Sequence, residues 1–170
     1  KSLDEYLEFD SNILFENKNH IVCIFGGAIR DIFANQPIND VDILCGSIAF
    51  IYLNNILLNN GYVYIDDLVS KHLSKMYQEI AIINEPKTYM KGDKKIQLIR
   101  PVIEECIQNF DHNTVNDNLY RAGFCDLISN VDLSCCGLSY DGELHENYPN
   151  AIIHAENKLF SINLYWHLCT

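Results

Sequence analysis

The chain has 170 residues, of which 48% are hydrophobic and 21% are charged, and its formal net charge is -11. This length and composition suit one soluble domain with a buried core, so we expect a single domain over residues 1–170. No apolar run approaches the ~20 residues of a membrane span, and the polar N-terminus is unlike a signal peptide. We therefore expect a cytoplasmic protein with no membrane partner. Because the sequence does not begin with Met, a fragment of a longer chain stays open as an alternative.

The charge is unevenly distributed along the chain, and this affects which binding partners we expect. Residues 71–100 carry seven basic residues against three acidic ones, whereas the rest of the chain is strongly acidic. An acidic protein is a poor general nucleic-acid binder, because affinity for phosphate backbones comes mainly from Lys and Arg. The basic segment predicts either a local phosphate-binding surface or a solvated face rich in Lys.

Seven cysteines occur in the chain, with no C-x-x-C pair. Most lie inside apolar runs, where a thiol behaves as a small hydrophobic group. We expect reduced core cysteines, with neither a zinc site nor a disulfide framework.

Apolar spacing predicts alternating helices and strands in the first half of the chain. The expected elements are a short helix within residues 4–16, a strand over 20–25, a helix over 28–34, a strand over 40–45, a helix with Ser47 as its N-cap that runs to about residue 60, and a strand over 62–65.

The second half is less regular. The expected elements are a helix over 67–77, strands over 79–83 and 95–99 joined by a connection, a helix over 101–110, a strand over 131–140 and a turn at Asp141-Gly142, followed by a tail without clear period. Together these elements predict an α+β or mixed α/β fold, with a small mixed sheet flanked by helices.

The most informative block runs from Ile24 to Leu44. A strand that ends in Gly26-Gly27 lets the backbone approach a ligand closely, and the following helix points free N–H groups at that place. About ten residues later, Asp40-Val41-Asp42 begins a strand. Residues i and i+2 of a strand share one face, so the two carboxylates converge. Carboxylates beside a phosphate site are ligands that Mg²⁺ prefers.

The pattern Gly-Gly-Ala-Ile-Arg-Asp followed by Asn-Asp-Val-Asp-Ile resembles the head motif of the poly(A) polymerase and CCA-adding (class II) group. This group lies within the DNA polymerase β-like nucleotidyltransferase superfamily. The resemblance implies the nucleotidyltransferase fold over residues 1–170 as one catalytic domain. It also implies that Gly26 and Gly27 hold an NTP triphosphate and that Asp40 and Asp42 bind Mg²⁺ or Mn²⁺.

Arg30 and Asp31 match the Arg-Asp pair of the same motif. The resemblance implies that they help to bind the nucleotide, with Arg30 either contacting phosphate or supporting the loop. From the residues alone, an ion pair between Arg30 and a nearby acid is an equal alternative.

A weaker match covers Asp132-Leu133-Ser134, which resembles the Arg-Arg-Asp-Phe-Thr segment of CCA-adding enzymes with Asn130 and Val131 in place of the two arginines. The superfamily usually supplies a third carboxylate from a later strand. Gln97 stands where that acid is expected, so Asp132 is the best substitute, and Asp66 or Asp67 is the next. A sheet-edge or capping role for Asp132 stays open.

Two classes of function follow. The first is a divalent-metal-dependent transferase that moves an NMP from an NTP to an acceptor hydroxyl, with release of pyrophosphate. Its acceptor is an RNA 3′ end by resemblance, or a small molecule or a protein, as the acidic charge would favour. The second is a degenerate domain that binds a nucleotide or a partner without catalysis, which Gln97 favours. The oligomeric state is left open by the sequence.

Overall fold

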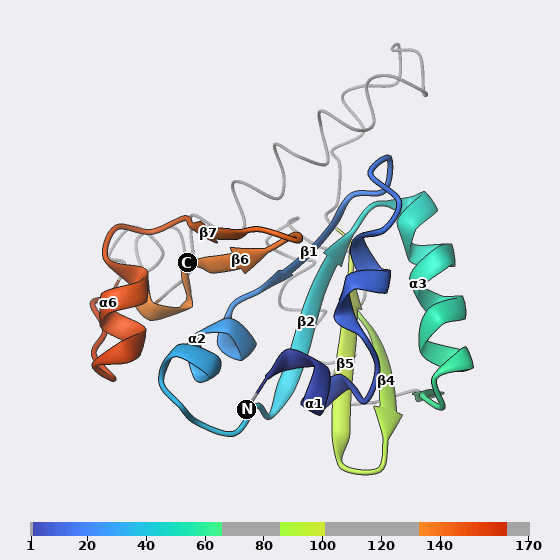
Figure 1. Cartoon of the computed structure of the whole chain (residues 1–170), viewed down its shortest axis with the longest axis horizontal. Helices are drawn as coiled ribbons and strands as arrows, with labels where there is room; N and C mark the ends of the chain where they lie inside the picture. Colours follow the sequence, from blue (N-terminus) through green and yellow to red (C-terminus); the bar gives the residue numbers. More distant parts are fainter. Residues whose placement is uncertain (1, 66–85, 101–132, 163–170) are drawn as a thin grey trace.

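The computed structural model describes residues 2–65, 86–100 and 133–162 (Figure 1). The strands in these ranges form one sheet in the order β3-β4-β5-β2-β1-β6-β7. Their bounds are β1 Val22–Phe25, β2 Asp40–Cys45, β3 Val63–Ile65, β4 Lys87–Lys91, β5 Lys94–Ile99, β6 Leu138–Tyr140 and β7 Leu144–Glu146. Because β2 pairs with β5 in parallel and the other described pairs are antiparallel, the sheet is mixed.

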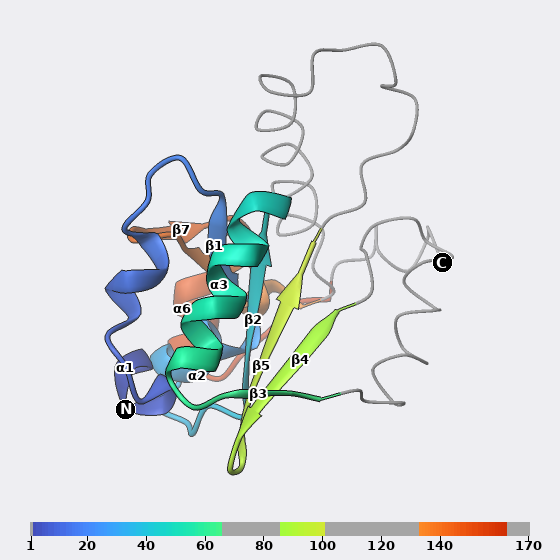
Figure 2. The same cartoon turned by 90° about the vertical axis from the view of Figure 1, so that its right-hand side faces the viewer.

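Helices cover one side of this sheet, as Figure 2 shows for α1, α2 and α3. The described helices are α1 Leu3–Leu7, α2 Gly27–Phe33, α3 Ser47–Asn59 and α6 Ala151–Glu156, with 3-10 helices η1 Ser11–Phe15 and η3 Ser134–Cys136. Their apolar residues and those of the strands form one buried cluster. The predicted fold class, a mixed sheet flanked by helices, is confirmed.

The central strand β2 shows how the sequence sets the two faces of the sheet. Val41 and Ile43 have no exposed surface and belong to the buried cluster, whereas Asp40 and Asp42 alternate with them and lie on the opposite face. The alternation therefore separates a packing face from a face that carries the carboxylates.

The elements predicted around the Gly-Gly turn are confirmed to within a few residues, and β2 has the predicted bounds. The N-cap of α3 is Gly46, so the prediction of Ser47 is wrong by one residue. Strand β4 was expected to be a connection. Gly92 has a φ of 62° in the tight turn between Lys91 and Lys94, which are register partners, and this turn joins β4 and β5 into a hairpin.

The described part of the predicted strand over 131–140 divides into three pieces. Leu133 forms an isolated bridge with Ile162, η3 follows, and β6 begins only at Leu138. The hydroxyl of Ser134 lies 2.7 Å from Nδ1 of His154 and accepts the N–H of Ser161 at 2.8 Å. These long-range bonds satisfy polar groups of the segment where a continuous ladder was predicted.

The tail also differs from the expectation, since α6 was not predicted. The predicted turn at Asp141-Gly142 is confirmed between β6 and β7. The helices expected over 67–77 and 101–110 and the strand expected over 79–83 lie outside the described residues. Within the described ranges, no helix has both the length and the apolar character to cross a bilayer.

Candidate functional site

The Gly-Gly turn lies beside the carboxylate strand. Phe25, the residue before the turn, is the register partner of Asp42. Gly26 has a φ of 76°, a conformation that favours glycine, and its N–H donates to the carbonyl of Leu138 on β6 at 3.0 Å. The turn is thus fixed between β1 and β6 and leads into α2 next to the start of β2 (Figure 1).

Asp40 and Asp42 share one face of β2, as the sequence predicts. The Oδ1 atom of Asp42 is buried and has no hydrogen-bond partner among the described residues. Burial raises the pKa of Asp42 from 3.8 to about 7, and the charge of Asp40 adds to this rise. A buried carboxylate without a partner is costly unless a cation compensates it, so the pair fits a divalent ion.

The neighbouring strand β5 places two more side chains in line with this pair. Gln97 is the register partner of Asp42, and Lys95 is the register partner of Asp40. The side-chain amide of Gln97 donates to the hydroxyl of Thr88 on β4 at 3.3 Å. The place where a third carboxylate was expected therefore holds a neutral amide. No group of three His, Cys, Asp or Glu residues that could hold a metal ion occurs within the described ranges.

Arg30, in the middle of α2, is engaged with protein groups. Its Nε and Nη2 atoms lie 2.8 Å and 2.7 Å from Oδ1 of the buried Asp31, and Nη1 lies 3.4 Å from the sulfur of Cys136. A Cβ added to Gly27 would lie 3.4 Å from Nη2 of Arg30. The ion pair weighed in the sequence analysis is present, and the guanidinium lies against the Gly-Gly turn.

The sequence predictions for Asp132 and the cysteines have different outcomes. Asp132 lies outside the described residues, so its role stays a prediction. Cys45, Cys135 and Cys136 are free thiols, and Cys23, Cys45 and Cys135 are buried. Burial raises the pKa of Cys45 to about 12, so this thiol is neutral at physiological pH.

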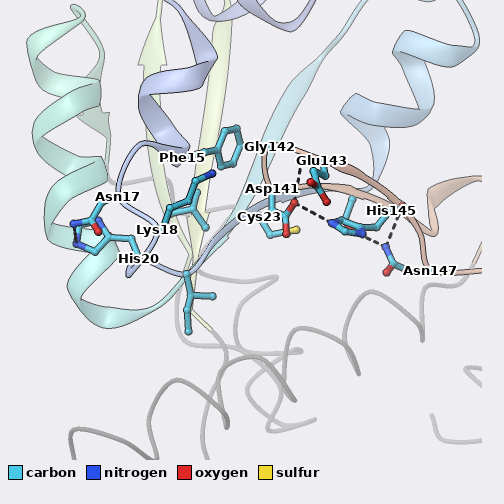
Figure 3. A pocket seen from close by; sticks show the side chains of 13 residues that line it. Phe15, Asn17, Lys18, His20, Cys23, Asp141, Gly142, Glu143, His145 and Asn147 are labelled. Carbon is cyan, nitrogen blue, oxygen red and sulfur yellow. Dashed lines mark hydrogen bonds and ion pairs between the residues drawn. The ribbon is translucent and has the colours of Figure 1, made fainter.

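A cavity that the sequence analysis did not identify opens between the loop before β1 and the β6–β7 hairpin, with a volume of about 590 Å³ (Figure 3). Polar residues of the hairpin line one side of it. Nε2 of His145 lies 2.9 Å from Oδ1 of Asp141, and the amide of Asn147 donates to the hydroxyl of Ser139 at 2.7 Å. The cavity depends on long-range contact between two loops, so no local sequence signal could have located it.

Comparison with solved structures identifies the fold. A CCA-adding enzyme in complex with ATP aligns with 95% of this chain and 36% of its own at a TM-score of 0.55 and 11% identity. A tRNA-processing enzyme in an apo form aligns with 94% of this chain and 36% of its own at a TM-score of 0.54 and 13% identity. The chain thus has a nucleotidyltransferase fold that resembles the head domain of CCA-adding enzymes.

A further similar structure is the Thermotoga maritima CCA-adding enzyme in complex with tRNA, with a TM-score of 0.54 and 11% identity. The alignment includes 95% of this chain but only 36% of that enzyme. The chain therefore spans about a third of the length of each of the three solved structures. Neither a protein-family model nor a curated protein matches the chain by sequence.

Proposed function

We propose that this domain transfers a nucleoside monophosphate from an NTP to an acceptor hydroxyl and releases pyrophosphate. The observation that carries the proposal is the carboxylate pair on β2. Asp40 and Asp42 share the face away from the apolar core, and the buried Oδ1 of Asp42 has no hydrogen-bond partner among the described residues. Asp42 lies next to the Gly26-Gly27 turn, since Phe25, the residue before the turn, is its register partner.

Each residue has a physical role in this reaction. Asp40 and Asp42 would hold Mg²⁺ or Mn²⁺, which supplies charge for an in-line displacement at a phosphoryl group. Gly26 and Gly27 let a triphosphate approach the backbone without a Cβ in the way. Arg30, held by Asp31, carries positive charge beside that turn and either contacts phosphate or keeps the loop in shape. Asp132 is proposed as a third acid.

The proposed acceptor is an RNA 3′ end, a small molecule or a protein. Solved structures with this fold include an enzyme in complex with tRNA, which supports an RNA 3′ end. The net charge of -11 supports instead a small molecule or a protein, because phosphate backbones bind mainly to Lys and Arg.

A second candidate function is a domain that binds a nucleotide or a partner without catalysis. The observation in its favour is Gln97, whose neutral amide pairs in register with Asp42. A third acid on β5 would add the charge that a second divalent ion needs.

The test is a transfer assay with each α-labelled NTP, with Mg²⁺ or Mn²⁺, and with RNA, small hydroxyl compounds and a protein mixture as separate acceptors. Label on an acceptor together with released pyrophosphate is the expected result. The variant Asp40→Asn should abolish both, because it removes a charge from the metal pair while it keeps the shape of the side chain.

Asp93→Asn is the matched control, because Asp93 is an exposed acid in the turn of the β4–β5 hairpin and its loss changes the net charge equally. It should retain transfer. NTP binding that does not depend on metal or on Asp40, with no transfer to any acceptor class, would support the second candidate and contradict the first.

A further inference from the structure

The hydroxyl of Tyr6 on α1 bridges two strands that lie far from it in sequence. It donates to the carbonyl of Asn39 at 2.7 Å, and it accepts the backbone N–H of Lys95 at 2.9 Å. The carbonyl of Lys95 lies 3.2 Å from the same hydroxyl. One side chain thus joins the residue before β2 to the second residue of β5.

This bridge lies at the open end of the parallel β2–β5 ladder. The register of the ladder begins with Asp40 opposite Lys95, and Asn39 directly precedes Asp40. Asn39 is exposed and precedes the first residue of the ladder, whereas the N–H of Lys95 is partly buried, and a backbone group withdrawn from water is costly without a partner. The Tyr6 hydroxyl supplies the partner for a carbonyl of one strand and an N–H of the other, next to the first metal-pair residue.

The hydroxyl is suited to this role because it stays protonated at neutral pH. Burial raises the pKa of Tyr6 and outweighs the hydrogen bond with the backbone of Lys95, which lowers it. A protonated hydroxyl can donate to one strand and accept from the other at the same time.

Other contacts hold α1 in place independently of this hydroxyl. The hydroxyl of Tyr62 donates to the carbonyl of Leu7 at 3.1 Å, and Glu8 forms ion pairs with Lys91 at 2.9 Å and Lys94 at 2.7 Å. Leu3 and Leu7 are also buried in the core. Loss of the Tyr6 hydroxyl alone should therefore leave the helix docked and affect mainly the β2–β5 end.

We propose that Tyr6 is a positioning residue for the metal pair: its hydroxyl fixes the spacing of β2 and β5 at Asp40 and Lys95, and so presents Asp40 to a divalent ion. This inference rests on the proposed function, in which Asp40 and Asp42 hold that ion. Tyr6 itself touches neither the ion nor the substrate.

The test compares Tyr6→Phe with Tyr62→Phe. Both variants remove one tyrosine hydroxyl that links α1 to the rest of the fold, but only the first removes the bridge beside Asp40. Mn²⁺ affinity is measured from the paramagnetic resonance signal of the free ion, and hydrogen exchange is followed at the Lys95 amide. Tyr6→Phe should weaken Mn²⁺ binding about tenfold, as outer-shell partners of metal ligands do, and speed exchange at Lys95. Tyr62→Phe should change neither.

Three outcomes separate the inference from its basis. Unchanged Mn²⁺ affinity in a folded Tyr6→Phe protein overturns the positioning role. Equal weakening by both variants also overturns it, because it indicates general loosening of α1. If wild-type protein binds no Mn²⁺, or binds it equally well after Asp40→Asn, the proposed function fails, and Lys95 exchange then reports only whether Tyr6 holds the strands together.

Discussion

The two faces of β2 arise from one alternating pattern, but burial stabilises the fold on one face and is costly on the other. On the helix-covered face, Val41 and Ile43 lose all contact with solvent, and burial of apolar surface stabilises the fold. On the other face, Asp42 is half-buried, and its Oδ1 atom is withdrawn from water; there burial raises its pKa to about 7 and leaves Oδ1 without a partner among the described residues. One face of the strand contributes stability, and the other carries a cost that a bound cation would offset.

The largest expected effect is on the apolar face. Ile43→Ala removes a fully buried side chain from the centre of the core, and we expect it to lower the free energy of unfolding by about 2–5 kcal/mol. Urea denaturation of the variant and the wild type measures this difference. A loss well under 1 kcal/mol would show that the core relaxes around the gap. The apolar face of β2 would then contribute little more to stability than the carboxylate face.

On the opposite face, Asp42→Asn should stabilise the metal-free protein at alkaline pH. The folded-state pKa of Asp42 is raised from 3.8 to about 7, so its contribution to stability is fully present below pH 3.8 and is lost as the pH rises through about 7. The asparagine removes this dependence, and we expect a gain on the order of 1–2 kcal/mol at pH 8 and none near pH 4. Thermal unfolding across this pH range measures it.

The same variant should bind Mn²⁺ far more weakly, because it removes one charge of the pair. Stabilisation together with lost metal binding would show that Asp42 is kept for function at the expense of stability. A variant that is less stable than wild type at pH 8 would contradict the cost assigned to the buried carboxylate.

The sequence predicted the arrangement of the candidate site residues where the signal is local, and their roles stay a prediction. Gly26-Gly27 and the Asp40–Asp42 pair lie within one short block, and strand periodicity alone places both acids on one face. The sequence also indicated Gln97 as the neutral residue at the third-acid position, and the register confirms that it pairs with Asp42.

The sequence could not predict features that depend on tertiary contact. The Tyr6 bridge joins residues 33 and 89 positions apart, and nothing near Tyr6 indicates it. The burial of Asp42 has the same origin, since an alternating strand predicts a face but not its exposure. Helix α6 was missed although Asn150, a residue type that often precedes a helix, stands at its N-cap, because the six residues of the helix are too few to show a clear apolar period.

Gln97→Glu sharpens the comparison by adding an acid to the face that already carries two. If this position corresponds to a third carboxylate, the variant should bind Mn²⁺ about tenfold more tightly, since hard cations bind more strongly as carboxylate ligands are added. Titration with Mn²⁺ measures the change. Thr88→Val is the control for loss of the Gln97–Thr88 hydrogen bond, and it should not raise affinity. Unchanged or weaker binding by Gln97→Glu would place the third ligand elsewhere.

The smallest effect is expected at a charge that lies away from both faces of β2. Hydrogen bonds from Lys94 and Lys91 lower the pKa of Glu8 from 4.5 to about 2, but Glu8 is exposed, so solvent and salt screen these pairs. The contribution is present above pH 4.5 and is lost as the pH falls through about 2. Glu8→Gln should lower the thermal midpoint at pH 7 much less than Ile43→Ala does, and the difference from wild type should shrink in 1 M salt. A shift comparable to that of Ile43→Ala, or one that salt does not reduce, would show that Glu8 holds α1 through packing. An exposed charge would then matter as much to stability as the carboxylate of Asp42, against the comparison of the two regions.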